Sequence, residues 1–130
     1  MKTVTSLLLC LLISGIGHTQ QNDTIFYSAN WKNTSKEYAS FYRPLPLEEV
    51  DGKFLVKDFY QSGQLQMQGT SMEKDKDVFD GLVIWYYPNG TKQYERTYKN
   101  GRLHGKTTGY FINGQLKTQG MFNIGHYEEG

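Results

Sequence analysis

A short element, an aromatic residue followed by two others and a glycine, recurs three times and constrains the fold of this chain more than any other feature. The copies lie at residues 60–63, 87–90 and 111–114. The second copy begins 27 residues after the first, and the third begins 24 residues after the second. The extra residues of the first interval fit an insertion in the polar run 72–77. Self-similarity at this spacing is typical of repeat proteins.

Each copy is predicted to form a β-hairpin whose loop ends in glycine. Pro88, Asn89 and Gly90 stand between segments rich in Tyr, Trp, Val and Ile. A two-residue loop on Asn89 and Gly90 would place Pro88 where the strand ladder needs an N–H group, which proline lacks. We therefore expect three-residue loops at residues 61–63, 88–90, 99–101 and 112–114. The expected turn glycines, with positive φ, are Gly63, Gly90, Gly101, Gly114 and Gly125.

Side chains beyond each loop alternate with a period of two, which indicates strands. Because a lone hairpin is marginally stable in water, neighbouring units must pack side by side. The predicted fold is all-β: a single elongated antiparallel meander of two-stranded repeats with an N-terminal cap. The sets expected to share a face are Tyr94, Arg96 and Tyr98; Leu65, Met67 and Gly69; and Leu116, Thr118, Gly120 and Phe122.

The repeat resembles the variant MORN repeat of bacteria, on the residues 86–90 (Tyr-Tyr-Pro-Asn-Gly) and 98–105 (Tyr-Lys-Asn-Gly-Arg-Leu-His-Gly). The resemblance covers about residues 54–130 and implies two-stranded MORN-like units, about three in number with the last incomplete. The middle copy departs from the pattern at Arg96, where the other copies have Gly69 and Gly120.

The resemblance also implies two narrower roles. Family members often carry an antitoxin label, so a toxin-neutralising, immunity-like protein is one alternative. Residues 41–43 and 56–67 are similar to the region that precedes such repeats in secreted proteins of Bacteroidetes type. Some of those proteins continue into a TonB-type energy-transducer domain, so the repeat region of an envelope transducer is the other alternative.

Residues 1–20 have the pattern of a signal peptide. Lys2 is followed by an apolar stretch at 7–16 and by small or polar residues. The stretch is shorter than the roughly 20 apolar residues that a membrane span needs. Cys10, the only cysteine, lies within it, so the mature protein is expected to be free of disulfides and either secreted or periplasmic.

Composition limits the kinds of partner that the remaining chain is expected to bind. Fourteen basic and 13 acidic residues give a net charge of +1, without the basic tract that would suggest nucleic acid or anionic lipid. Residues 22–36 are rich in Asn, Thr, Ser and Lys. The segment 21–53 as a whole is expected to cap the repeat domain at 54–130. The segment 125–130 looks like the start of a further unit. Either the chain is a piece of a longer protein, or the edge strand 115–122 is exposed.

No constellation of residues predicts catalysis, a metal site or a cofactor. His104 and His126 lie in expected turns without His or Cys at ligand spacing. The serines lack the spacing of a nucleophile elbow. Asp75, Asp77 and Asp80 lack the spaced ligands and closing glutamate of a calcium loop. The chain is therefore predicted not to be an enzyme.

Aromatic side chains are the strongest functional signal. Alternate strand residues face opposite ways, so one aromatic of each neighbouring pair must point outward. These rings can form the core of a curved sheet, or one face can be a docking strip, since tyrosine is enriched at interfaces. We predict an exported protein that binds another protein through a sheet face or edge. The candidate interaction residues are Trp85, Tyr86, Tyr87, Tyr94, Tyr98, Tyr110 and Phe111.

Replacing Gly90 with valine is expected to lower the free energy of unfolding by more than about 1 kcal/mol, because valine resists a positive φ. Lys92→Thr, two residues away, is expected to be nearly neutral. Thermal melting of the two variants checks the turn assignment. Equal melting temperatures would contradict it.

Overall fold

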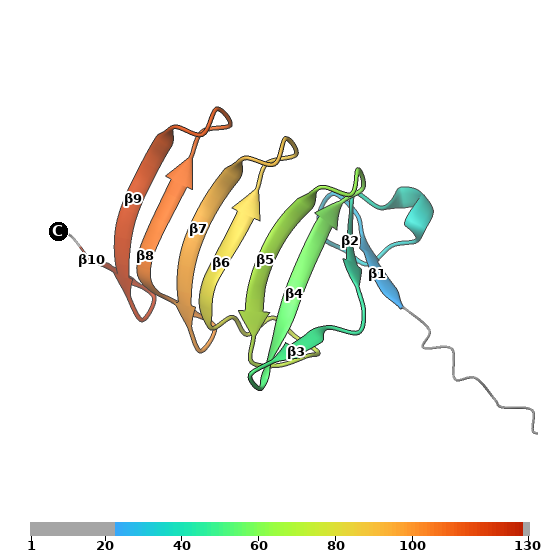
Figure 1. Cartoon of the computed structure of the whole chain (residues 1–130), viewed down its shortest axis with the longest axis horizontal. Helices are drawn as coiled ribbons and strands as arrows, with labels where there is room; N and C mark the ends of the chain where they lie inside the picture. Colours follow the sequence, from blue (N-terminus) through green and yellow to red (C-terminus); the bar gives the residue numbers. More distant parts are fainter. Residues whose placement is uncertain (1–22, 129–130) are drawn as a thin grey trace, which may run out of the picture.

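The computed structural model describes residues 23–128, which form one ten-stranded antiparallel sheet (Figure 1). The order β1-β2-β4-β5-β6-β7-β8-β9-β10, with β3 beside β4, confirms the predicted all-β meander. The expected signal peptide at 1–20, with Cys10, lies outside the described residues. The elements are β1 (Thr24–Tyr27), the 3-10 helix η1 (Lys36–Tyr38), β2 (Phe41–Pro44), β3 (Glu48–Val50), β4 (Lys53–Tyr60), β5 (Leu65–Ser71), β6 (Gly81–Tyr86), β7 (Lys92–Lys99), β8 (Arg102–Tyr110), β9 (Leu116–Asn123) and β10 (His126–Glu128).

The N-terminal end of the sheet is built from β1, β2 and β3. Strands β2 and β3 lie one after the other along the same edge of β4, at its end and its start respectively. Pro44 and Pro46 separate them, since proline cannot donate a ladder hydrogen bond. Trp31 stacks on Phe41 with ring centroids 4.2 Å apart. This end of the sheet is therefore packed with aromatic side chains.

Three hairpins, β4–β5, β6–β7 and β8–β9, share one turn geometry. In each, the glycine N–H donates to the carbonyl of the aromatic residue three positions earlier, at 2.8 to 2.9 Å. The same aromatic residue donates its own N–H to the residue after the glycine, at 2.8 to 2.9 Å. These bonds confirm the predicted three-residue loops at 61–63, 88–90 and 112–114. All five predicted turn glycines have positive φ, between 80° and 90°.

The loop predicted at 99–101 is wrong by one residue. Lys99 pairs directly with Arg102, so the loop consists of Asn100 and Gly101 alone. Their φ values are 49° and 80°, as a type I′ turn requires. No proline precedes this Asn-Gly pair, so nothing opposes the tighter turn. Pro88 therefore enforces a three-residue loop at 88–90, whereas the turn after Lys99 is free to use two residues.

A β-bulge follows each three-residue loop at the same place. Pairing shifts by one residue between Asp58 and Phe59, between Trp85 and Tyr86, and between Gly109 and Tyr110. Beyond the extra residue, side chains of the second strand that would have pointed to one face of the sheet point to the other.

The bulges correct two of the predicted shared faces. Leu65 pairs with Phe59 while Met67 pairs with Asp58. Because neighbouring residues of β4 face opposite ways, Leu65 and Met67 cannot share a face. The same holds in β9, where Leu116 is separated from Thr118, Gly120 and Phe122.

One face of the sheet carries the hydrophobic core, and we call it the core face. Val56, Met67 and Val83 are buried there, and Val56 and Val83 have no exposed surface. Gly69 lies between the two valines, because it pairs with Val56 and its α-carbon faces Val83. A Cβ atom at Gly69 would lie 2.8 Å from Val83 Cγ2. The glycine therefore creates the space that Val83 fills.

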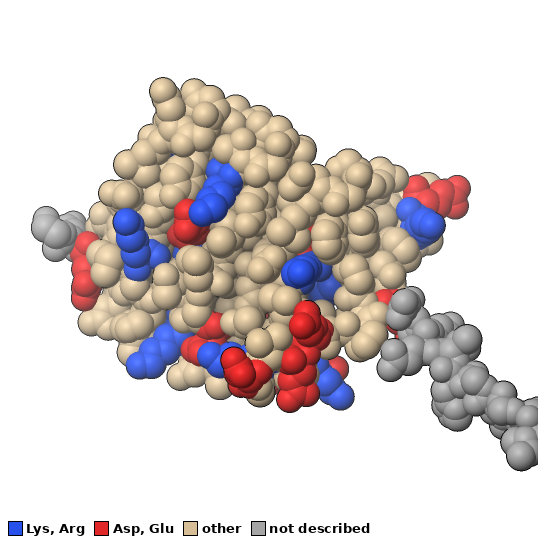
Figure 2. Space-filling view, in the orientation of Figure 1, with Lys and Arg blue, Asp and Glu red and all other residues tan. Residues whose placement is uncertain are grey.

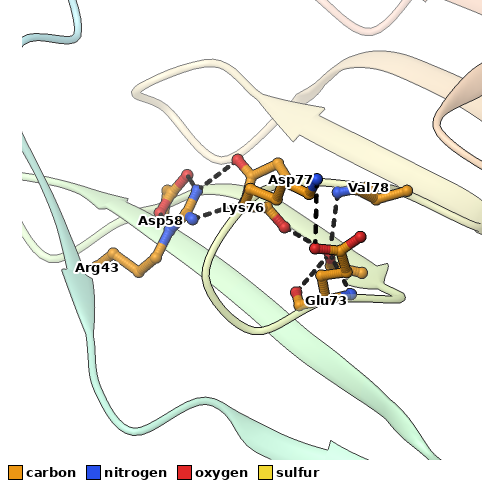
Figure 3. Close-up of polar contacts among 7 residues, drawn as sticks. Arg43, Asp58, Glu73, Lys76, Asp77 and Val78 are labelled. Carbon is orange, nitrogen blue, oxygen red and sulfur yellow. Dashed lines mark hydrogen bonds and ion pairs between the residues drawn. The ribbon is translucent and has the colours of Figure 1, made fainter.

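The loop 72–80 connects β5 to β6 and contains the predicted insertion. Ser71 is fully buried, and its Oγ accepts hydrogen bonds from the N–H groups of Glu73 and Val78, at 3.2 and 3.0 Å. Phe79 packs against the core cluster. These contacts tie the loop to the end of β5 and to the core face (Figure 3).

A guanidinium that is largely shielded from solvent joins this loop to the N-terminal strands. Arg43 of β2 donates two hydrogen bonds to Asp58 of β4, at 2.6 and 2.8 Å, and two to Asp77 of the loop, at 2.8 and 3.0 Å (Figure 3). Burial raises the pKa of Asp58 above its ordinary value, while the hydrogen bonds from Arg43 oppose that rise. Removing Arg43 would leave the buried carboxylate of Asp58 without its ion-pair partner, which is costly.

Replacing Gly69 with alanine is expected to destabilise the protein by about 1–3 kcal/mol, because the added methyl group overlaps Val83. Urea denaturation measures the change. In the double variant with Val83→Ala, the smaller side chain makes room for the new methyl group. The double variant should therefore lose less stability than the two single changes together, and strict additivity would contradict the proposed fit.

Candidate interaction surface

Three of the predicted interaction residues lie together on the core face. Trp85 of β6 pairs with Tyr94 of β7, and Tyr98 lies four residues further along β7, on the same face. The ring centroids of Trp85 and Tyr98 are 6.3 Å apart, and Tyr98 also contacts Phe79 at 5.8 Å. All three candidates remain partly exposed. They form a continuous aromatic surface beside the buried core.

Tyr86 and Tyr110 lie on the opposite face. The Tyr110 hydroxyl donates to Glu95 at 2.8 Å, and Lys92 donates to the same carboxylate oxygen at 3.1 Å. Burial alone would raise the pKa of Glu95, but the hydrogen bonds from Tyr110 and Lys92 outweigh it and lower that pKa below its ordinary value. The hydrogen bond to Glu95 raises the pKa of Tyr110. This cluster is a polar contact between β7 and β8.

Tyr87 has a structural role that the sequence did not reveal. Its hydroxyl donates to the backbone carbonyl of Tyr110, at 2.8 Å, and the hydroxyl of Tyr60 donates to the carbonyl of Tyr86, at 2.6 Å. The two tyrosines occupy the same position in successive repeats, and each bonds to the next unit. The third copy has Phe111 there, which has no hydroxyl group and is 47% exposed.

Arg96 lies among the aromatic residues of the core face. Its guanidinium carbon is 4.5 Å from the ring centroid of Tyr94 and 5.5 Å from that of Trp85. Across the ladder, Arg96 pairs with Thr107 of β8. Sequence reasoning placed Arg96 on one face with Tyr94 and Tyr98, and the structure confirms this shared face. It did not include Arg96 among the interaction residues, although an arginine between two aromatic residues at alternate positions was a signal that could have identified it.

We use the name aromatic–arginine surface for Trp85, Tyr94, Arg96 and Tyr98. The strands make their principal contacts with their sheet neighbours alone, so within residues 23–128 no second sheet covers this surface. In Figure 2, basic and acidic side chains are intermixed on the visible face of the molecule, without a large patch of either sign.

Three of the polar residues considered for chemistry have other partners. His104 Nδ1 accepts the N–H of Ile124 at 3.1 Å. Asp77 binds Arg43, and Asp80 pairs with Lys53 and accepts the N–H of Asn100 at 3.1 Å. In the part of the chain that the structure describes, no three His, Cys, Asp or Glu residues are grouped to hold a metal ion. The same residues contain no helix of the length and apolarity that crossing a membrane requires.

An open cavity of about 480 Å³ lies away from the aromatic–arginine surface, near the N-terminal end of the sheet. Among the described residues, its ionisable lining side chains are Asp23, Lys74 and Asp75. The lining residues are Asp23, Leu45, Pro46, Leu47, Phe54, Lys74 and Asp75.

Comparison with known families identifies the middle repeat. Residues 79–100 match the family described as MORN repeat variant. The matched stretch contains the β6–β7 hairpin and therefore the whole aromatic–arginine surface. No curated protein and no solved structure matches the chain.

Replacing Tyr110 with phenylalanine is expected to lower the free energy of unfolding slightly at pH 7, because the partly exposed carboxylate of Glu95 loses a hydrogen-bond donor. Because the pKa of Glu95 is lowered in the folded state, its ionised carboxylate stabilises the protein at pH values above the ordinary pKa of 4.5. This stabilisation is lost as the pH falls through the folded-state pKa. Urea denaturation at pH 7 and at about pH 3 should therefore show a difference from wild type that shrinks in acid. Tyr38→Phe is the control, since Tyr38 is 70% exposed.

A difference between wild type and the Tyr110→Phe variant that stays constant with pH would contradict the role assigned to Glu95.

Proposed function

We propose that this chain, which carries a MORN repeat variant at residues 79–100, is an exported, non-enzymatic protein that binds another protein. Its main docking area is the aromatic–arginine surface of β6 and β7. The observation that carries the proposal is the unequal covering of the core face. Val56, Met67 and Val83 are buried, whereas Trp85, Tyr94 and Tyr98 on the same face stay partly exposed.

The residue types on this surface support binding. Trp, Tyr and Arg are the residues most often found as energetic centres of protein interfaces. An aromatic ring gives a large contact area at a low cost in conformational entropy. The regular strands also fix the side chains in place before a partner arrives, which reduces the entropy that binding must overcome.

The outer edge of β9 offers a second docking route. Strand β10 pairs only with residues 121–123 of β9, so within residues 23–128 the outer edge at 116–120 has no strand partner. Unpaired edge groups can accept an added strand from another chain. Leu116 and Met121, which lie on this strand, are about half exposed, at 54% and 47%. An edge-bound strand would lie beside the same repeat array.

Export is part of the proposal and rests on the pattern of residues 1–20. Secretion or transfer to the periplasm would remove this segment. Mass spectrometry of the protein recovered from cells would show the loss of about 20 N-terminal residues, as expected for a cleaved signal peptide. The intact N-terminus in that fraction would contradict export by this route.

The two narrower roles implied by the resemblance are both forms of protein binding. A toxin gene beside the coding sequence would favour neutralisation. A reading frame that continues into a transducer domain would favour the envelope energy-transducer role.

Replacement of Tyr94 with alanine is expected to weaken partner binding at least tenfold, because a central aromatic contact is commonly worth about 2 kcal/mol or more. Crosslinking mass spectrometry in the native cell envelope identifies the partner, and the affinity of each purified variant for it is then measured. Tyr86→Ala is the matched control, one position from Trp85 on the opposite face. Circular dichroism confirms that both variants are folded.

Equal affinities of the two variants would exclude the aromatic–arginine surface as the docking area. A wild-type protein that captures no partner and converts a substrate would overturn the binding function altogether.

A further inference from the structure

The open cavity near the N-terminal end of the sheet is formed mostly by segments outside the regular repeat. Its lining comes from the residue before β1, the β2–β3 connection, β4 and the loop 72–80. The β2–β3 connection contributes Leu-Pro-Leu at 45–47, and the loop carries the insertion that lengthens the first repeat interval. Loops held on a rigid sheet often carry function. The irregular parts of the chain therefore meet at one concave site.

Apolar side chains line most of this cavity. They belong to Leu45, Pro46, Leu47 and Phe54. All four retain accessible surface, and Leu47 also packs against the core cluster. The cavity volume of about 480 Å³ is in the range of small-molecule sites. An apolar group of a ligand can therefore enter and displace water from these side chains.

Charged side chains complete the lining, and they too are accessible. Asp23, Lys74 and Asp75 are exposed, and none of the three forms an ion pair within residues 23–128. By contrast, Asp77 of the same loop is bound to Arg43. Two carboxylates against one ammonium group leave an excess of negative charge in the cavity. A cleft with such an excess attracts a cationic ligand and repels an anionic one.

We propose that this cavity binds a small molecule that joins an apolar group to one cationic nitrogen, such as an arylalkyl amine. The apolar group contacts Leu45, Leu47 and Phe54, and the ammonium group donates hydrogen bonds to the carboxylates of Asp23 and Asp75. A concave site walled by several segments suits a compact ligand. This inference goes beyond the proposed function and does not depend on it, since the cavity lies away from the aromatic–arginine surface.

The first test titrates the purified protein with tryptamine and with tryptophol, in which a hydroxyl group replaces the amine. Binding is followed by the backbone amide resonances of Leu47 and Phe54 in a proton–nitrogen correlation spectrum. Both probes are expected to shift these resonances, and tryptamine should bind about tenfold more tightly, because two exposed carboxylates favour its charge. Equal affinities, or resonances that tryptamine leaves unchanged, would overturn the amine site.

The second test changes the charged lining. Asp75→Asn should weaken tryptamine binding about threefold and leave tryptophol binding unchanged. The double variant with Asp23→Asn should lose the preference for the amine. Glu128→Gln is the matched control, because this exposed carboxylate lies in β10 at the other end of the sheet. Equal loss in Asp75→Asn and Glu128→Gln would indicate nonspecific charge attraction and would refute the site.

The third test changes the apolar lining. Leu45→Ala should weaken the binding of both probes by a similar factor, about threefold, because each loses the same apolar contact. Leu82→Ala is the control, since Leu82 is 49% exposed and lies outside the cavity. Circular dichroism confirms that both variants are folded. Unchanged affinities in Leu45→Ala would show that the probes bind elsewhere and would refute the cavity site.

Two further measurements separate this site from protein binding. Tyr94→Ala should leave tryptamine affinity unchanged, and a loss would move the amine to the aromatic–arginine surface and refute the cavity site. The peptide acetyl-Gly-Lys-Leu-Gly-amide, which carries its cation on a lysine side chain, is expected to bind more weakly than tryptamine. Tighter binding of the peptide would assign the cavity to a protein segment and overturn the small-molecule proposal.

Discussion

The structure depends on complementary side-chain size between neighbouring strands of a single-layer sheet. Without a second sheet to form a core, each unit must bury its apolar groups against the next unit. Gly69 shows how this works, because its missing side chain gives Val83 the space to become fully buried. Tyr60 and Tyr87 add the polar equivalent, a hydroxyl bonded to a carbonyl of the following repeat. Each repeat is therefore stabilised by its contacts with the neighbouring repeat.

The same constraint explains why one half of the core face is closed and the other half is open. The loop 72–80 is tied across the N-terminal strands by Arg43, which bonds both Asp58 and Asp77. No comparable loop occurs among the described residues after β7, where Asn100 and Gly101 make a tight turn. The aromatic rings near Arg96 consequently stay partly exposed, and this division of the face underlies the proposed function.

Local signals explain which parts of the fold could be predicted. Pro88, Asn89 and Gly90 specify a three-residue loop by their own backbone preferences, and the structure has that loop. The bulges were not predictable, because an extra residue in one strand is recognised only when its pairing with the neighbouring strand is known. Leu116 was therefore assigned to the wrong face. The ion pairs of Arg43 were also missed, since they join residues 15 and 34 positions apart.

The sequence by itself determined the strand-forming repeats, the position of their turn glycines and the aromatic residues placed at alternate positions. These are properties of a few consecutive residues, whose backbone preferences act within one hairpin. The tertiary structure decided the faces, because the register of paired strands depends on residues far apart in the chain. The period of two had already placed Arg96 on the same face as Tyr94, but only strand pairing brought Trp85 and Thr107 against it, and so made an irregular residue of the repeat part of a candidate binding surface.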